Sequence, residues 1–113
     1  MTTVPLTCNL EEISTAFRPV FQRWNIARAI LFGSWARGEP TRHSDIDLVL
    51  VQQTDKRFLD RLNGLLFELN QASPGPSVEA LVYTPEELAA MKTRSFIGSV
   101  LRDGKVLYES SRS

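Results

Sequence analysis

Short apolar runs of strand length recur along the chain and are separated by polar or amphipathic segments. Runs of four to eight apolar residues bounded by turn residues are typical of buried strands. The Ser73-Pro74-Gly75-Pro76 stretch is an unambiguous break before one of them. Four segments are therefore predicted to be strands: residues 27–32, 47–51, 77–83 and 105–108.

Helices are predicted between these runs. Asn9 with Glu12 three residues later has the spacing of a capping box, and the helix it begins should kink or end at Pro19. Residues 84–87 form another helix start, with proline at the first helical position. A last short helix is expected around residues 96–101, closed by Gly104. Its apolar positions are Phe96, Ile97, Val100 and Leu101.

Residues 56–70 carry the clearest helical periodicity, and we expect one continuous helix there. Gly64 weakens it by roughly 1 kcal/mol relative to alanine, and the sequence gives no reason for this glycine. Phe67 lies opposite the apolar stripe, so either another part of the domain covers it or it faces a partner. The stripe consists of Phe58, Leu59, Leu62, Leu65, Leu66 and Leu69.

The order of these elements predicts an α/β (α+β) fold with a small mixed sheet flanked by helices. We expect one domain spanning residues 1–113, with loose ends at 1–8 and 110–113. The 13 basic and 13 acidic side chains cancel, so strong nucleic-acid binding is not expected. Cys8 is the single cysteine, which excludes an intrachain disulfide. Without a secretory leader pattern or an apolar run of membrane-spanning length, we expect a cytoplasmic protein.

Two aspartates at the head of the second apolar run carry the candidate chemistry. Asp45 and Asp47 are two residues apart in an extended segment, so both point to one face while Ile46 points to the core. Paired carboxylates suit a hard cation such as Mg²⁺. The Gly33-Ser34 turn after the first apolar run could hold a phosphate at a helix start. Together these features favour phosphoryl or nucleotidyl transfer.

The run Gly33-Ser34-Trp35-Ala36-Arg37-Gly38, followed by Ser44-Asp45-Ile46-Asp47-Leu48, resembles a known motif. It is similar to that of the minimal nucleotidyltransferases (MNT proteins) of the DNA polymerase beta superfamily. The specific match covers residues 33–48, and a looser one in element order extends from about 27 to 108. The resemblance implies a nucleotidyltransferase (polymerase beta-like) fold. Many MNT proteins are antitoxins paired with a HEPN-domain toxin.

The resemblance also implies a set of site residues. Asp45 and Asp47 would hold two Mg²⁺ ions, and Gly33 and Ser34 would bind the triphosphate. A third acid on a neighbouring strand would hold one metal and help to deprotonate the nucleophile, and Glu79 is the candidate. Many relatives have aspartate there, and glutamate is longer by about 1.5 Å. The alternative for Glu79 is an ordinary surface-facing strand residue.

Two other motif residues, Arg37 and Ser44, each have two possible roles. Arg37 could contact phosphate, or pair with Glu39 or an internal carboxylate. Ser44 could touch the nucleotide, although capping the aspartate turn is the simpler role. Gly38 fits a helix C-cap, and Trp35 is expected to pack beneath the loop.

Three functions are compatible with these residues. The first is an Mg²⁺-dependent enzyme that moves a nucleotidyl group, most simply AMP from ATP, onto a tyrosine hydroxyl of a HEPN toxin and so acts as an antitoxin. The second is an antitoxin that neutralises its partner by contact alone. The third is small-molecule nucleotidylation, as in the similar aminoglycoside adenylyltransferases, which would need a second subunit for the acceptor. A partner protein or self-association is expected in each case, and the sequence does not reveal which nucleoside triphosphate is used.

Overall fold

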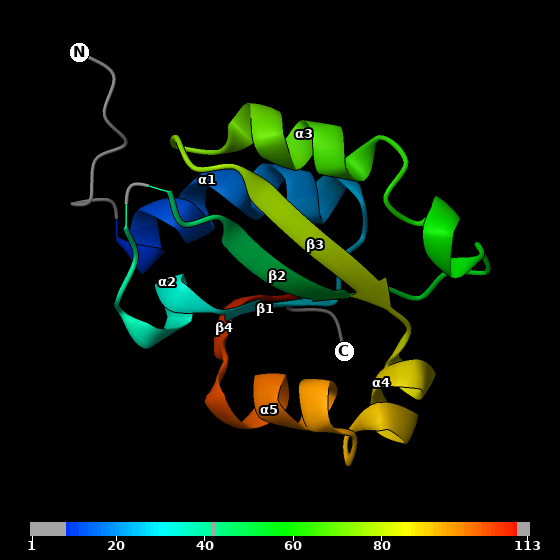
Figure 1. The fold of residues 1–113 in the computed structure, drawn as a ribbon. Helices are drawn as coiled ribbons and strands as arrows, with labels where there is room; N and C mark the ends of the chain where they lie inside the picture. The colour runs from blue at the N-terminus through cyan, green and yellow to red at the C-terminus, as the bar shows by residue number, and fades with distance from the viewer. Residues whose placement is uncertain (1–8, 42, 111–113) are drawn as a thin grey trace.

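A four-stranded mixed β-sheet forms the centre of the molecule (Figure 1). The computed structural model describes residues 9–41 and 43–110. The strand order is β3-β2-β1-β4, in which β1 pairs antiparallel with both β2 and β4, and β2 pairs parallel with β3. The predicted small mixed sheet is confirmed. The strands are β1 (Arg28–Phe32), β2 (Ile46–Val51), β3 (Val78–Tyr83) and β4 (Lys105–Glu109).

Helices cover both faces of the sheet (Figure 1). One face, called here the α1–α3 face, packs against α1 (Leu10–Arg23) and α3 (Leu65–Ala72). The other, the α4–α5 face, packs against α4 (Pro85–Met91) and α5 (Ser95–Asp103). Because side chains alternate along a strand, each strand contributes to both layers.

The buried apolar side chains form two clusters, one on each face of the sheet. The larger cluster joins α1 and α3 to the sheet and includes Phe17, Phe21, Leu31, Ile46, Leu48, Leu50, Leu65 and Leu69. The smaller cluster lies under α4 and α5 and consists of Ile30, Val49, Val51, Tyr83, Leu88, Ile97 and Val100. Asp47 lies between Leu48 and Ile46 in sequence and therefore projects to the α4–α5 face.

The capping box predicted at Asn9 is present, and the helix start predicted at residues 84–87 also forms a capping box. The Glu12 N–H donates to Asn9 Oδ1 at 2.9 Å, and the Glu87 N–H donates to Thr84 Oγ1 at 3.1 Å. Pro19 was predicted to kink or end the first helix, and it does not end it, because α1 continues to Arg23. Its last turn contains Val20 and Phe21, which are buried. Burial of these two side chains offsets the backbone hydrogen bond that proline cannot donate.

The continuous helix predicted for residues 56–70 is not formed. The chain instead makes a single 3₁₀ turn, η1 (Phe58–Asp60), and α3 begins only at Leu65. Gly64 precedes α3 with a φ of 83°, a left-handed conformation that favours glycine, which explains this residue. Leu59, assigned to the buried stripe, is 85% exposed. Phe67 is 68% exposed, so no described part of the domain covers it.

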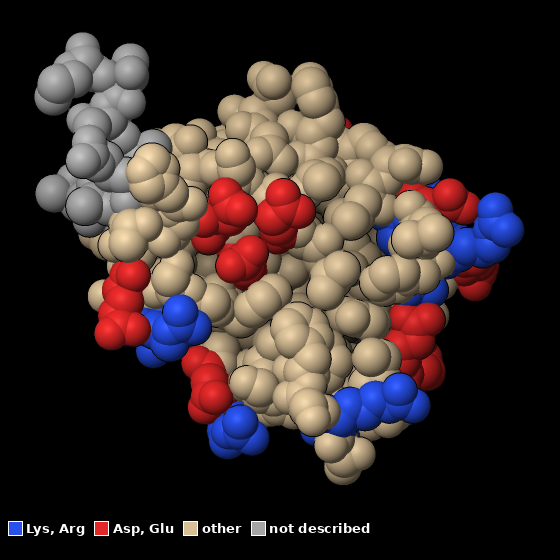
Figure 2. Space-filling view, in the orientation of Figure 1, with Lys and Arg blue, Asp and Glu red and all other residues tan. Residues whose placement is uncertain are grey.

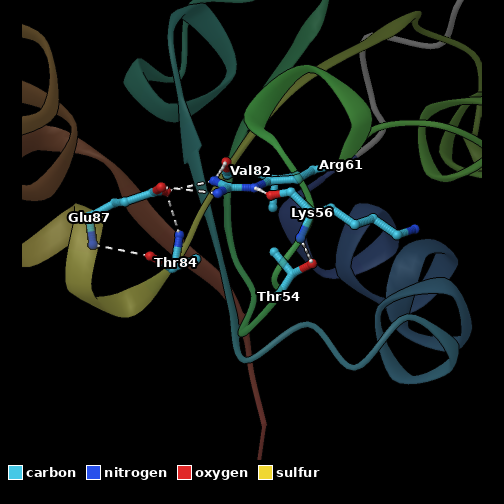
Figure 3. Close-up of polar contacts among 6 residues, drawn as sticks. All are labelled: Thr54, Lys56, Arg61, Val82, Thr84 and Glu87. Atoms are coloured by element: carbon cyan, nitrogen blue, oxygen red, sulfur yellow. Dashed lines mark hydrogen bonds and ion pairs between the residues drawn. The ribbon is translucent and has the colours of Figure 1, made fainter.

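A buried arginine holds the irregular segment in place. Arg61 is 6% exposed and donates two hydrogen bonds to the carboxylate of Glu87, at 2.6 and 3.0 Å (Figure 3). It also donates to the carbonyl oxygens of Val82 at 3.2 Å and Lys56 at 2.9 Å. These contacts satisfy a charge that would be costly to bury alone. Arg61 thus ties the loop after β2 to the end of β3 and the start of α4.

The chain ends are described only in part. The N–H of Ser110 donates to the carbonyl oxygen of Ala27 at 2.8 Å, which continues the pairing of β4 with β1 by one bond. The ends predicted to be loose were 1–8 and 110–113, and of these residues all but Ser110 lie outside the described part of the chain. Within residues 9–41 and 43–110, no helix is both long and apolar enough to cross a membrane.

Candidate functional site

Three carboxylates lie on the open part of the α4–α5 face, at the start of the parallel strands β2 and β3. Asp47 and Glu79 are direct neighbours in the register of these two strands. Asp45 precedes β2 by one residue and shares the face of Asp47, while Ile46 between them is fully buried on the other side. The pairing of β2 with β3 therefore brings together the three acids that the sequence placed 34 residues apart at most.

The electrostatics of this group are unfavourable without a bound cation. Burial, and then the charges of Asp45 and Glu79, raise the pKa of Asp47 above its usual value. Among the described residues, no lysine, arginine or histidine forms an ion pair with any of the three. Figure 2 shows the acidic side chains gathered over the starts of β2 and β3, with no basic side chain between them in this view.

The surroundings of Glu79 differ from those expected from the sequence. The sequence suggested an acid within a buried strand, whereas the Glu79 side chain is exposed at the edge strand β3. Its exposure alone would fit an ordinary surface residue. Its place beside Asp47 is what makes it a candidate ligand or base.

Gly33 brings the turn after β1 against the carboxylate of Asp47. It has a φ of 79°, and a methyl group at this position would lie 2.6 Å from Oδ2 of Asp47. Only glycine therefore allows this close approach without strain. Gly33 is the N-cap of the short helix α2 (Ser34–Arg37), which ends at Gly38 in a left-handed conformation, as predicted. The turn thus places Gly33 and Ser34 next to the acidic group.

The loop before Asp45 is held by its own side chains. The hydroxyl of Ser44 accepts a hydrogen bond from the N–H of Thr41 at 2.8 Å, which is the capping role considered for Ser44. Trp35 is buried beneath the loop, as expected, and its Nε1–H points to the carbonyl oxygen of Ser44 at 3.4 Å. These contacts fix the backbone that presents Asp45.

Arg37 is not directed at the acidic group in this structure. Its Nε lies 3.6 Å from Oε1 of Glu39, and both side chains are mostly exposed. The pairing with Glu39 that the sequence left open is therefore the one observed. Such an exposed pair contributes at most about 1 kcal/mol, so Arg37 remains available to a phosphate.

A cavity of about 190 Å³ adjoins the motif on the side of α5. Its walls include Phe32, Gly33 and Arg37 from the motif side, and Phe96, Ser99 and Asp103 from α5. The sequence places Phe96 among the apolar packing positions of this helix and singles out neither Ser99 nor Asp103. One signal was available: adjacent helical positions are 100° apart, so Phe96 and Ile97 point in different directions and only one of them can lie at the centre of the buried face. Ile97 is fully buried, whereas Phe96 is 44% exposed.

The three carboxylates of Asp45, Asp47 and Glu79 are oxygen ligands of the kind that Mg²⁺ prefers, but they do not form a complete ligand cage. In the described ranges, no set of three or more His, Cys, Asp and Glu side chains is arranged to hold a metal ion. Mg²⁺, however, is commonly bound through one or two carboxylates together with substrate phosphates. The unpaired carboxylates of Asp45 and Asp47 beside the Gly33 turn fit that mode of binding.

The fold and this site define a nucleotidyltransferase, and the family comparison agrees. The family model described as "Polymerase beta, Nucleotidyltransferase" matches residues 15–113. The chain therefore belongs to the polymerase beta nucleotidyltransferase family and is a nucleotidyltransferase by that membership.

Individual relatives support the same family. A Methanocaldococcus jannaschii protein that is provisionally named a protein adenylyltransferase is 37% identical over 100 residues, which are 88% of this chain and 94% of the relative. The crystal structure of a provisionally named nucleotidyltransferase from Sulfolobus solfataricus has a TM-score of 0.58 at 18% identity, covering 92% of this chain and 84% of that one. The crystal structure of a toxin–antitoxin with AMP-PNP has a TM-score of 0.61 at 19% identity, covering 87% and 74%. The two structures establish the shared fold.

Proposed function

We propose that this protein transfers AMP from ATP to a hydroxyl group of a partner protein, in a reaction that depends on Mg²⁺. The observation that carries the proposal is the meeting of Asp45, Asp47 and Glu79 on one face, with the Gly33 turn against Asp47. The M. jannaschii relative named as a protein adenylyltransferase supports a protein acceptor. The toxin–antitoxin structure of the same fold supports a toxin as that acceptor, and the MNT resemblance suggests a tyrosine of a HEPN toxin.

The placement of the residues supports the following course for the proposed reaction. The acceptor oxygen attacks the α-phosphorus of ATP, the bond from that phosphorus to the bridging oxygen breaks, and pyrophosphate leaves. Gly33 and Ser34 bind the triphosphate through backbone N–H groups at the start of α2, which have no acceptor within the helix. Glu79 accepts the proton of the acceptor hydroxyl. Asp45 and Asp47 would hold Mg²⁺, which when bound neutralises charge on the phosphate oxygens.

Labelled nucleotide gives the test. The protein is incubated with Mg²⁺ and α-labelled ATP, with and without a HEPN-domain candidate, and label is followed by gel and mass spectrometry. The Asp45→Ala, Asp47→Ala double variant removes two charges from the site. An Asp55→Ala, Glu109→Ala variant removes two exposed charges outside the site and serves as the matched control.

The outcomes separate catalysis from contact. Label on the partner that persists in the control variant and disappears in the site variant supports the transferase and identifies the acceptor. A stable complex that receives no label from any of the four nucleotides would refute it. The protein would then act as a binding antitoxin on a nucleotidyltransferase fold.

A further inference from the structure

The cavity between α2 and α5 offers a place for the base of the nucleotide. We propose that Phe96 stacks on that base and that Asp103 accepts a hydrogen bond from its exocyclic amino group. This inference rests on the proposed nucleotidyl transfer and extends it to which nucleotide base the site prefers. The cavity has a volume of about 190 Å³ and begins at Gly33, the residue that contacts Asp47.

The face of α5 that borders the cavity is distinct from the face that packs on the sheet. Phe96, Ser99 and Asp103 follow at i, i+3 and i+7, so they lie along one side of the helix. Ile97 and Val100 point to the smaller buried cluster and supply the packing. The side that carries Phe96, Ser99 and Asp103 is therefore free to face the motif.

Phe96 is held in place and still partly accessible. Its ring meets that of Phe32 edge to face, with centroids 5.3 Å apart and an interplanar angle of 83°. The contact orients the ring, while 44% of the residue stays exposed. Every base has a π-face, so stacking on this ring would supply affinity for any nucleotide rather than selectivity.

Asp103 can provide the selectivity. An ionised carboxylate only accepts hydrogen bonds. It pairs with an amino group of adenine, cytosine or guanine but has no donor to offer the O4 oxygen of uracil. Asp103 lies 3.4 Å from the Arg102 Nε at an exposed position, a weak pairing that leaves its other oxygen for a ligand. Asp103 therefore favours a base that presents an amino group where uracil presents O4, and we expect ATP to bind more tightly than UTP.

Binding measurements with three probes test this assignment. Dissociation constants are measured in Mg²⁺ for ATP, UTP and inorganic tripolyphosphate. Phe96→Ala should weaken ATP binding at least about fivefold, the loss expected when one base–aromatic stack is removed. It should leave tripolyphosphate unchanged. Asp103→Asn should reduce the preference for ATP over UTP, since an amide both donates and accepts. Phe67→Ala, an exposed aromatic on α3, is the matched control and should change neither.

Each alternative result has a definite meaning. Unchanged ATP binding in both cavity variants, with loss in the Asp45→Ala, Asp47→Ala variant, overturns the base pocket and leaves the proposed function intact. An equal loss of ATP and tripolyphosphate binding in Phe96→Ala means that Phe96 supports the fold, which also overturns the assignment. If the unmodified protein binds neither ATP nor tripolyphosphate, the proposed function itself fails.

Discussion

Replacing Glu87 by glutamine should destabilise the protein at neutral pH and remove part of its sensitivity to acid. Hydrogen bonds from Arg61, and then from the backbone N–H of Thr84, lower the pKa of Glu87 from 4.5 to about 2. A carboxyl group whose pKa is lower in the folded state stabilises the fold above its unfolded pKa. That contribution is lost as the pH falls through the folded value, here between about 4.5 and 2.

The size of the effect follows from the pKa and the exposure. A pKa shift of one unit corresponds to about 1.4 kcal/mol. The lowering of the Glu87 pKa from 4.5 to about 2 therefore limits its contribution to the free energy of unfolding to about 3.4 kcal/mol. The Glu87 side chain is 41% exposed, and solvent screening reduces this to about 1–2 kcal/mol. Arg61 keeps its bonds to Val82 and Lys56 in the variant, which prevents a larger loss.

Urea unfolding followed by tryptophan fluorescence measures this difference at pH 6 and pH 3. We expect the unmodified protein to exceed Glu87→Gln in stability at pH 6, and to lose more than half of that advantage at pH 3. Glu86→Gln, at an exposed position of the same helical turn, should match the unmodified protein at both values. A stability gap for Glu87→Gln that is equal at both pH values would refute the role of Glu87 ionisation.

Three further outcomes are expected. Gly33→Ala should lower nucleotide binding at least about tenfold in a titration. The φ of 79° and the 2.6 Å approach to Asp47 leave no room for a methyl group, and the substitution adds a strain of about 1–2 kcal/mol. Unchanged binding would show that the turn does not touch phosphate. Asp47→Asn should raise the melting temperature of the nucleotide-free protein, because it removes repulsion with Asp45 and Glu79. Its transferase activity should fall at least about a hundredfold. A lower melting temperature would contradict this account. Leu69→Ala should lower the free energy of unfolding in urea by about 2–5 kcal/mol, whereas Leu59→Ser should lower it by under about 0.5 kcal/mol. Equal losses would indicate that both leucines are buried on one continuous helix.

Strands and helix starts could be read from the sequence because their signals are local. The alternation around Ile46 decided which aspartates share a face, and the Asn9 and Thr84 caps marked where helices begin. The adjacency of Asp47 and Glu79 could not be derived in this way. It depends on the parallel pairing of β2 with β3, which only the resemblance implied. The roles of these acids in catalysis stay predictions.

The failure between residues 56 and 64 has a tertiary cause. Leucine periodicity favours a helix there, but Arg61 forms its bonds only when the loop turns it toward Val82 and Glu87. Gly64 then adopts a positive φ, and α3 begins directly after it. A pattern of apolar positions does not reveal the hydrogen bonds that Arg61 forms with residues distant in sequence. The isolated Gly64 was the one local sign that the helix is interrupted.

The unequal size of the two buried clusters implies that the two sides of the sheet open at different rates. Backbone amides of α1 and α3, anchored by the larger cluster, should exchange with solvent only when most of the domain unfolds. Helices α4 and α5 rest on fewer buried side chains and can detach in a smaller, more frequent fluctuation. One wall of the cavity beside Gly33 belongs to this less protected layer, whereas Asp47 sits on a central strand. A bound base would therefore slow amide exchange in α5 much more than in β2.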